Sequence, residues 1–214
     1  ILSQEAEKQN YYELLNADEK QKADTFSRAE LQQKYINTRG MLRKVLGTYL
    51  NTKPQDINIK IAEYGKPFVD DSEIFFNLSH TGNKLVIAVS NVGEIGIDLE
   101  QLKARKNLKG LVEKCFSVTE QQSWESLSER QQIIMFYYLW VRKEALVKAI
   151  GRGIAMGLDQ CIINPAQQTK FLSIPDGGDS INDWKIVEVK LNQEDVCVLV
   201  IKDINFNYQL IELE

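Results

Sequence analysis

The sequence predicts an α+β fold made of two similar halves, each with helices packed on a small, mostly antiparallel sheet. The hydrophobic pattern changes from a helical spacing to short alternating runs once in each half of the chain. The predicted strands are separated by tight turns, which is typical of antiparallel connections. With 43% apolar side chains among 214 residues, the chain can bury a sizeable core. We expect the halves to be residues 1–101 and 102–214.

The first half is predicted to begin with helices and end with strands. Residues 3–50 are expected to be helical with a break near residues 16–18, because apolar side chains beyond the break recur on one helical stripe. Four strands should follow, and turn residues separate them. They are predicted over residues 57–61, 74–78, 84–90 and 94–99.

The second half repeats this order. Residues 117–120 and 128–131 both fit the capping-box pattern, so we expect a helix to begin at each place and the second to end before Gly151. Glycine and proline indicate a loop over residues 175–180. Strands are predicted over residues 159–163, 184–191, 196–202 and 209–213.

Charge and composition argue against several classes of protein. The net charge of −4 lacks the basic excess that a general nucleic-acid-binding protein shows. The longest apolar run, residues 196–201, is far shorter than the roughly 20 residues that cross a membrane. Three separated cysteines among apolar neighbours indicate buried, reduced thiols and a cytoplasmic location. The only histidine, His80, leaves little material for a catalytic triad or a histidine-rich zinc site.

Two carboxylates at the end of the strand over residues 94–99 suggest a metal site. Asp98 and Glu100 are two positions apart, so they share one face of the strand while Ile97 and Leu99 occupy the other. Paired hard oxygen ligands suit Mg²⁺, which takes one or two protein carboxylates and completes its shell with water and phosphate. The alternative is a solvated strand end.

The helix predicted over residues 129–149 offers a third ligand. Phe136, Trp140, Glu144 and Lys148 follow one another at intervals of four and therefore line one face. This arrangement favours a metal-binding carboxylate with a phosphate-neutralising ammonium one turn away. An ordinary ion pair beside a core tryptophan is the alternative.

Further cations suggest a bound polyanion. Arg39 and Arg43 share one face of a helix segment that carries six cations between residues 22 and 44. Lys66 lies between glycine and proline, and Ser79 and His80 precede a glycine turn, so each could donate to phosphate oxygens. Solvated helix faces and ordinary turns are the alternatives.

Taken together, the sequence resembles the 4′-phosphopantetheinyl transferases of the surfactin-synthetase-activating (Sfp-type) group. The similarity is spread from about residue 18 to residue 163, in conserved order and spacing. It rests on residues 64–67 (YGKP), 76–82 (FNLSHTG), 95–100 (IGIDLE), 116–120 (FSVTE), 136–148 (FYYLWVRKEALVK) and 151–153 (GRG).

This resemblance implies an activity, a fold and partners. Enzymes of this family transfer phosphopantetheine from coenzyme A to a serine of an apo acyl, peptidyl or aryl carrier protein and release adenosine 3′,5′-bisphosphate. The site lies in the cleft between two similar halves, and the double-length members are monomers. The resemblance therefore implies coenzyme A and Mg²⁺ as ligands, and the competing hypothesis is an inactive module that binds coenzyme A or a carrier.

The resemblance also assigns roles to residues. Asp98, Glu100 and Glu144 would bind Mg²⁺, and Glu144 would accept the serine proton directly or through a bound water. Lys148 would stabilise the leaving phosphate. The contacts to coenzyme A would come from Lys66, Ser79, His80, Lys148, Arg39 and Arg43, with Lys143 as a weaker candidate.

Overall fold

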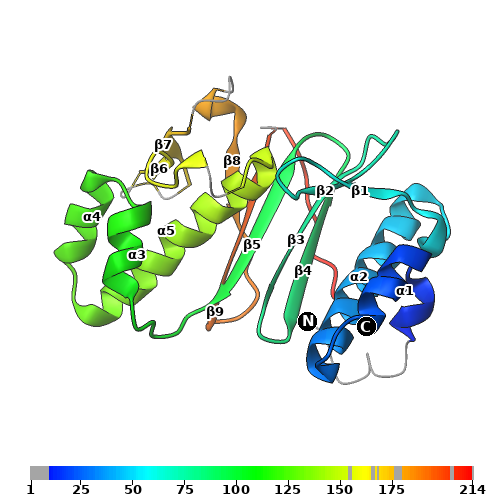
Figure 1. Ribbon diagram of the computed structural model, residues 1–214. Coiled ribbons are helices and arrows are strands. Elements are labelled where there is room, and N and C mark those ends of the chain that lie inside the picture. Colours follow the sequence, from blue (N-terminus) through cyan, green and yellow to red (C-terminus); the bar gives the residue numbers. More distant parts are fainter. Residues whose placement is uncertain are drawn as a thin grey trace.

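The computed structural model describes residues 10–153, 156–164, 167, 169–175, 180–202 and 205–213. Its α-helices are α1 (Ala17–Asp24), α2 (Ala29–Leu50), α3 (Leu108–Cys115), α4 (Val118–Glu125) and α5 (Glu129–Ile150). Short 3₁₀ helices are η2 (Tyr11–Leu14), η3 (Pro54–Asp56) and η5 (Ile181–Asp183). Figure 1 shows two groups of helices on either side of long central strands.

The strands form small antiparallel sheets. They are β1 (Ile59–Ile61), β2 (Pro67–Val69), β3 (Phe75–Thr81), β4 (Lys84–Ser90), β5 (Ile95–Gln101), β6 (Ile162–Ile163), β7 (Phe171–Ser173), β8 (Lys185–Glu188) and β9 (Asp195–Ile201). The largest sheet has the order β5-β9-β8, and β1-β2, β3-β4 and β6-β7 are two-stranded. Every strand pairing within these sheets is antiparallel, as the sequence predicts. The α+β class is therefore confirmed.

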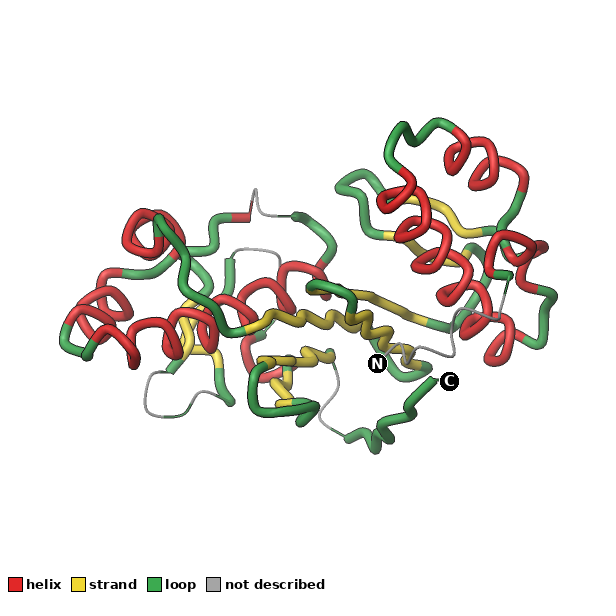
Figure 2. Tube along the Cα trace, turned by 90° about the horizontal axis from the view of Figure 1, so that it is seen from below, coloured by secondary structure: helices red, strands yellow, loops and turns green. Residues whose placement is uncertain are grey.

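β3 and β5 run side by side at the centre of the molecule, although they belong to different sheets (Figure 1). Figure 2 shows strands running through the middle of the molecule, with helices on both sides. Side chains of β3 join them: Asn77 Oδ1 accepts a hydrogen bond from the Ile97 amide at 2.9 Å, and Ser79 Oγ accepts one from the Leu99 amide at 3.2 Å. The residue numbers of the bonded partners increase together along both strands, so β3 and β5 run parallel. This seam joins the β3-β4 sheet to the β5-β9-β8 sheet.

The expected boundary after residue 101 falls at the end of β5. That strand pairs along its whole length with β9, so Asp98 lies opposite Val198 and Glu100 opposite Val196. β5 therefore belongs to the sheet of the C-terminal part, although we counted it with the first half. The division into residues 1–101 and 102–214 stays a prediction.

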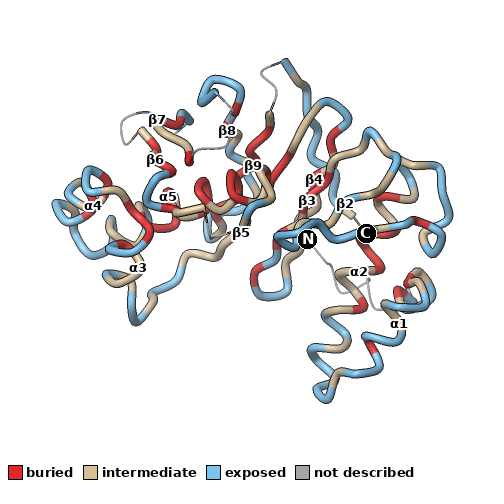
Figure 3. The backbone as a smooth tube through the Cα atoms, turned by 45° about the horizontal axis from the view of Figure 1, so that its top comes forward, coloured by how far each residue is buried: buried red, intermediate tan, exposed pale blue. Residues whose placement is uncertain are grey.

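Two 22-residue helices give the halves their similarity, and each ends at a residue in the left-handed conformation. α2 stops at Asn51, and α5 stops at Gly151. The capping boxes predicted at Ser117 and Ser128 are both present, and they begin α4 and α5. α5 is the most deeply buried helix because it packs across β5 and β9, as the buried colouring of Figure 3 shows.

Some sequence expectations need correction. Residues 209–213, all of which the structure describes, form no strand; they lie in extended coil with Leu210 and Ile211 exposed. The strand expected over residues 159–163 shortens to β6, because residues 158–160 form a turn. The helical region breaks before Ala17 and again at residues 25–28. Residues 3–9 and most of the loop expected over residues 175–180 lie outside the described residues.

None of the helices within the described ranges has the length and apolar character needed to cross a membrane.

Candidate active site

A buried acid–base cluster lies where β3, β5 and α5 meet. Asp98 is 5% exposed, and its Oδ1 accepts hydrogen bonds from Lys148 Nζ at 2.7 Å and from Ser79 Oγ at 2.8 Å. Lys148 Nζ also donates to Ser79 Oγ at 3.0 Å and to the carbonyl of Ile97 at 3.3 Å. Three elements far apart in the sequence thus converge on one aspartate.

Gly96 makes this convergence possible. A Cβ atom at this position would lie 2.0 Å from the carbonyl oxygen of Ala145 and 2.4 Å from the amide nitrogen of Ala149. The backbones of β5 and α5 therefore touch where only glycine fits. This close approach brings Glu144 and Lys148 of the helix beside Asp98 of the strand.

Two carboxylate oxygens in this cluster are unused. Within the described part of the chain, Asp98 Oδ2 and Glu144 Oε1 are both buried and neither has a hydrogen-bond partner. Burial, together with the negative charges of Asp98 and Glu100 and against the opposing charge of Lys148, raises the pKa of Glu144 to about 7. Buried polar atoms are normally satisfied, so the two free oxygens mark a place for a cation or donor.

Glu100 lies on the same face of β5 as Asp98, as predicted. Its Oε1 accepts a hydrogen bond from Arg105 Nη2 at 2.9 Å. Ile97 and Leu99 point the other way into a separate apolar cluster. The alternation of β5 thus turns the carboxylates toward α5 and the two apolar side chains toward the opposite face.

An open cleft of about 250 Å³ leads to Glu144 and Lys148. Residues from both halves line it, and they are Tyr64, Gly65, Lys66, Pro67, Asn77, Leu78, Glu144, Val147, Lys148, Gly151 and Gly153. Lys66 Nζ bridges the carboxylate of Glu94 and the carbonyl of Ala149, each at 2.5 Å, and so lies at the C-terminal end of α5. The cleft therefore carries two ammonium groups beside a carboxylate.

His80 and Arg39 do not line this cleft. His80 is exposed on β3, and the partial loss of water around its ring and the nearby charge of Lys34 lower its pKa. Arg39 Nε lies 3.9 Å from the carboxylate of Glu19 on α1. In the described structure neither residue forms a hydrogen bond or ion pair with Asp98 or Glu144, so their expected contacts with a ligand stay predictions.

Arg43 and Lys143 require correction, because both are fully buried away from the cleft. Arg43 donates to Glu19 at 2.5 Å and to the carbonyls of Pro54 and Ile57, so it ties α2 to α1 and η3. A side chain without exposed surface cannot reach a ligand in solution. We therefore remove both residues from the set expected to contact coenzyme A.

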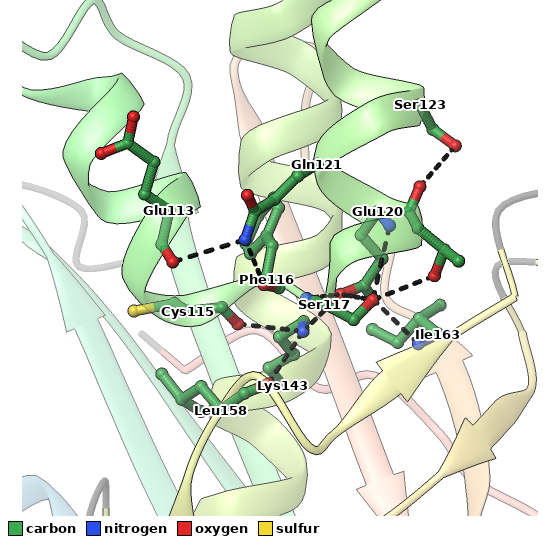
Figure 4. A network of polar contacts seen from close by, with 11 residues as sticks. Glu113, Cys115, Phe116, Ser117, Glu120, Gln121, Ser123, Lys143, Leu158 and Ile163 are labelled. Carbon is green, nitrogen blue, oxygen red and sulfur yellow. Dashed lines mark hydrogen bonds and ion pairs between the residues drawn. The ribbon is translucent and has the colours of Figure 1, made fainter.

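Lys143 occupies a second ionic cluster, which Figure 4 shows. Its Nζ donates to Glu120 Oε2 at 2.8 Å and to the carbonyls of Cys115 and Leu158 at 3.1 and 2.9 Å. Glu120 in turn accepts hydrogen bonds from the backbone amides of Ser117 and Ile163. Both charged side chains are 0% exposed, and the pair joins α3, α4, α5 and β6.

The carboxylates of Asp98 and Glu144 could supply some of the oxygen ligands of a magnesium ion. Asp98 and Glu144 each keep an oxygen free, and carboxylate oxygens are the ligands that Mg²⁺ prefers. Among the described residues, no three His, Cys, Asp or Glu side chains already enclose a metal position. This is compatible with Mg²⁺, which commonly takes only one or two protein carboxylates and fills its other positions with water and phosphate.

Three contributors were not predicted as site residues. Asn77 holds the seam, Arg105 holds Glu100, and Glu120 neutralises Lys143. Asn77 and Glu120 both lie in motifs that carry the family resemblance, over residues 76–82 and 116–120. Their partners are far away in the chain, so the motifs alone do not indicate them. Arg105 lies in the connection between β5 and α3, outside the motifs that carry the resemblance.

Two family models match consecutive parts of the chain. Residues 3–92 match the N-terminal model of 4′-phosphopantetheinyl transferases, and residues 94–201 match the model of the 4′-phosphopantetheinyl transferase superfamily. The second match covers half of the chain and includes Asp98, Glu100 and Glu144.

Individual relatives agree with these matches. A Synechocystis sp. protein, provisionally assigned as a 4′-phosphopantetheinyl transferase, is 34% identical over 82% of this chain and 72% of its own length. The 4′-phosphopantetheinyl transferase HetI of Nostoc sp. is 31% identical over 96% of this chain and 85% of its own. A 4′-phosphopantetheinyl transferase of Bacillus subtilis is 28% identical over 76% and 72%.

Proposed function

This chain belongs to the 4′-phosphopantetheinyl transferase superfamily and is an enzyme of that class, and from this premise we propose its reaction in detail. The enzyme transfers 4′-phosphopantetheine from coenzyme A to a serine hydroxyl of an apo carrier protein, with Mg²⁺ bound. Adenosine 3′,5′-bisphosphate is released. The observation that carries the proposal is the pair of unpartnered, buried oxygens on Asp98 and Glu144 beside the ammonium of Lys148.

Asp98, Glu100 and Glu144 would hold Mg²⁺ together with the pyrophosphate of coenzyme A. When bound, the cation offsets the negative charge that repels an incoming nucleophile and that grows on the leaving group. Lys148 would add a second positive charge at the same place. In the present structure its ammonium neutralises Asp98, so it is already held within 2.7 Å of the carboxylate.

The transfer forms one bond and breaks one. The serine oxygen attacks the phosphorus that carries the pantetheine, and the bond from that phosphorus to the bridging oxygen breaks. Adenosine 3′,5′-bisphosphate leaves with the electron pair. Glu144 would accept the serine proton, because this residue lines the cleft between the halves where the two substrates would meet.

Lys66, Ser79, His80 and Arg39 are proposed to contact phosphate groups of coenzyme A. Lys66 lines the cleft, and its ammonium can exchange Glu94 for a phosphate oxygen without leaving the end of α5. Ser79 is committed to Asp98 and Lys148, so its contribution would be shared with them.

We also propose an oligomeric state, a cellular location and a class of pathway for the enzyme. Both sides of the cleft come from one chain, which supports a monomeric enzyme of the Sfp type. Three buried free thiols suit the reducing conditions of the cytoplasm. The carrier could serve fatty-acid, polyketide or nonribosomal peptide synthesis, and a panel of apo carriers would identify the pathway.

A mass measurement tests the proposal. The protein is incubated with coenzyme A, MgCl₂ and each apo carrier, and the carrier is weighed by mass spectrometry. The expected gain is about 340 Da, the mass of one phosphopantetheine group, and it should vanish when EDTA removes the metal. A carrier whose serine is replaced by alanine is the control. No gain with any carrier would instead favour a module that only binds coenzyme A or carriers.

A further inference from the structure

Arg105 holds Glu100 from a position outside the cleft. The two side chains are 27% and 19% exposed, and Nη2 of the arginine donates to one carboxylate oxygen at 2.9 Å. Arg105 lies in the connection between β5 and α3, beyond the end of the strand that carries the carboxylates. It therefore reaches Glu100 from the side.

Arg105 is itself anchored to α5. Its Nε donates to the hydroxyl of Tyr137 at 3.1 Å, and that hydroxyl donates to the carbonyl of Lys103 at 3.0 Å. The guanidinium carbon lies 5.4, 5.7 and 5.9 Å from the ring centroids of Tyr137, Phe136 and Trp140, within the range of cation–π attraction. These contacts fix the guanidinium without help from Glu100.

The neighbouring charges explain why Glu100 needs such a partner. Glu100 shares its face of β5 with Asp98, and the charges of both act on Glu144, so three carboxylates repel one another. Lys148 offsets the charge on Asp98, and Arg105 offsets the charge on Glu100. Because its contact uses one oxygen, the other remains available to a metal.

We propose that Arg105 is a positioning residue for the metal site: the aromatic rings of α5 fix its guanidinium, and the guanidinium holds Glu100 ready for a divalent cation. Hydrogen-bonded partners of metal ligands commonly set metal affinity in this way. The inference rests on the proposed function, because it takes Glu100 as a ligand. It adds the connection after β5 to the parts of the chain that determine activity.

Metal affinity gives a direct test that does not depend on turnover. Mn²⁺, which favours the same octahedral oxygen ligands as Mg²⁺, is titrated into the protein with coenzyme A present, and free Mn²⁺ is read by electron paramagnetic resonance. Arg105→Ala should weaken Mn²⁺ binding about 10-fold. Arg105→Lys should be intermediate, because it keeps the charge and loses the planar fork. Lys106→Ala is the matched control: the side chain is adjacent, cationic and exposed, and affinity should not change.

Kinetics and a second variant separate positioning from mere structural support. For Arg105→Ala, the Mg²⁺ concentration needed for half-maximal transfer should rise while the rate at saturating Mg²⁺ largely recovers. Tyr137→Phe keeps the ring and removes the hydroxyl, so it should weaken Mn²⁺ binding less and in the same direction. That variant keeps the test decisive if Arg105→Ala fails to fold.

The outcomes that overturn the inference are distinct. If the wild-type protein binds Mn²⁺ and the Arg105 and Tyr137 variants bind it equally well or more tightly, the role of Arg105 alone is overturned. A wild-type protein that transfers phosphopantetheine without binding Mn²⁺ or needing Mg²⁺ would overturn the metal assignment and this inference together.

Discussion

Lys143 and Glu144 are neighbours on α5, yet they belong to two ionic clusters of opposite character. Lys143 pairs with Glu120 in the interior, where both side chains are 0% exposed and backbone groups complete their hydrogen bonds. Glu144 lines the cleft and lies beside Asp98, and each keeps a buried oxygen without a partner in the described structure.

The difference separates a structural ion pair from a functional one. A saturated buried pair has nothing left to offer a ligand, so its role is to join α3, α4, α5 and β6. An unsaturated cluster is costly in the isolated protein, and that cost is recovered when a ligand completes it. Charge type and sequence position do not distinguish the two clusters; they differ in the unpartnered oxygens and in the open cleft that Glu144 lines.

The saturated pair should give the largest loss of stability. In Glu120→Gln the buried ammonium of Lys143 loses its counter-charge, which should lower the free energy of unfolding by about 3–5 kcal/mol. Urea unfolding followed by circular dichroism measures it. Glu113→Gln is the control, because Glu113 pairs with Lys109 at the surface at 3.9 Å and should change stability by less than about 1 kcal/mol. An equal, small effect of both variants would refute the distinction.

The unsaturated cluster should give the opposite result. Glu144→Gln should reduce Mg²⁺-dependent transfer at least about 100-fold and leave the protein folded, with Asp98→Asn behaving similarly. Burial and the charge of Asp98 raise the pKa of Glu144 to about 7, so the stability its neutral form contributes at acid pH is lost as the pH rises through that value. At pH 8 the glutamine variant should therefore unfold at an equal or higher urea concentration. Near-normal turnover would contradict the assignment.

Gly96 tests the unsaturated cluster through the backbone alone, because its lack of a side chain lets α5 bring Glu144 and Lys148 beside Asp98. Gly96→Ala would push α5 away from β5, which should cost about 1–3 kcal/mol and reduce transfer. Gly110→Ala is the control: its Cβ would meet only the movable side chain of Asn107, so stability should be unchanged or slightly higher. Unaltered turnover in Gly96→Ala would show that the close approach of α5 to β5 is not needed.

The smallest effect concerns the buried thiols. Burial raises the pKa of Cys161 and of Cys197 to about 12, so both stay neutral in the folded protein at pH 8. Iodoacetamide should label them in urea and not in the native state. Their contribution to stability is complete below the ordinary thiol pKa and is lost as the pH rises toward about 12. Rapid native labelling at pH 8 would show that the core around β9 opens easily.

Local chemistry explains what could be predicted. The capping boxes at Ser117 and Ser128 begin helices because their partners lie three residues away. β4 has the predicted bounds, residues 84–90, and Asp98 and Glu100 share a face because alternation is a local property. The expectation for residues 209–213 was wrong because alternation alone cannot supply a partner strand.

The sequence by itself determined the α+β class, the family and the carboxylates of the cleft, since these depend on short-range periodicity and on motifs in order. Only the tertiary structure decided which charged side chains are free to act. Arg43 and Lys143 carry the same charges as Arg39 and Lys148, but long-range packing buries the first two against Glu19 and Glu120. The partners that neutralise a charge come from distant parts of the chain, and so the availability of that charge is a property of the fold.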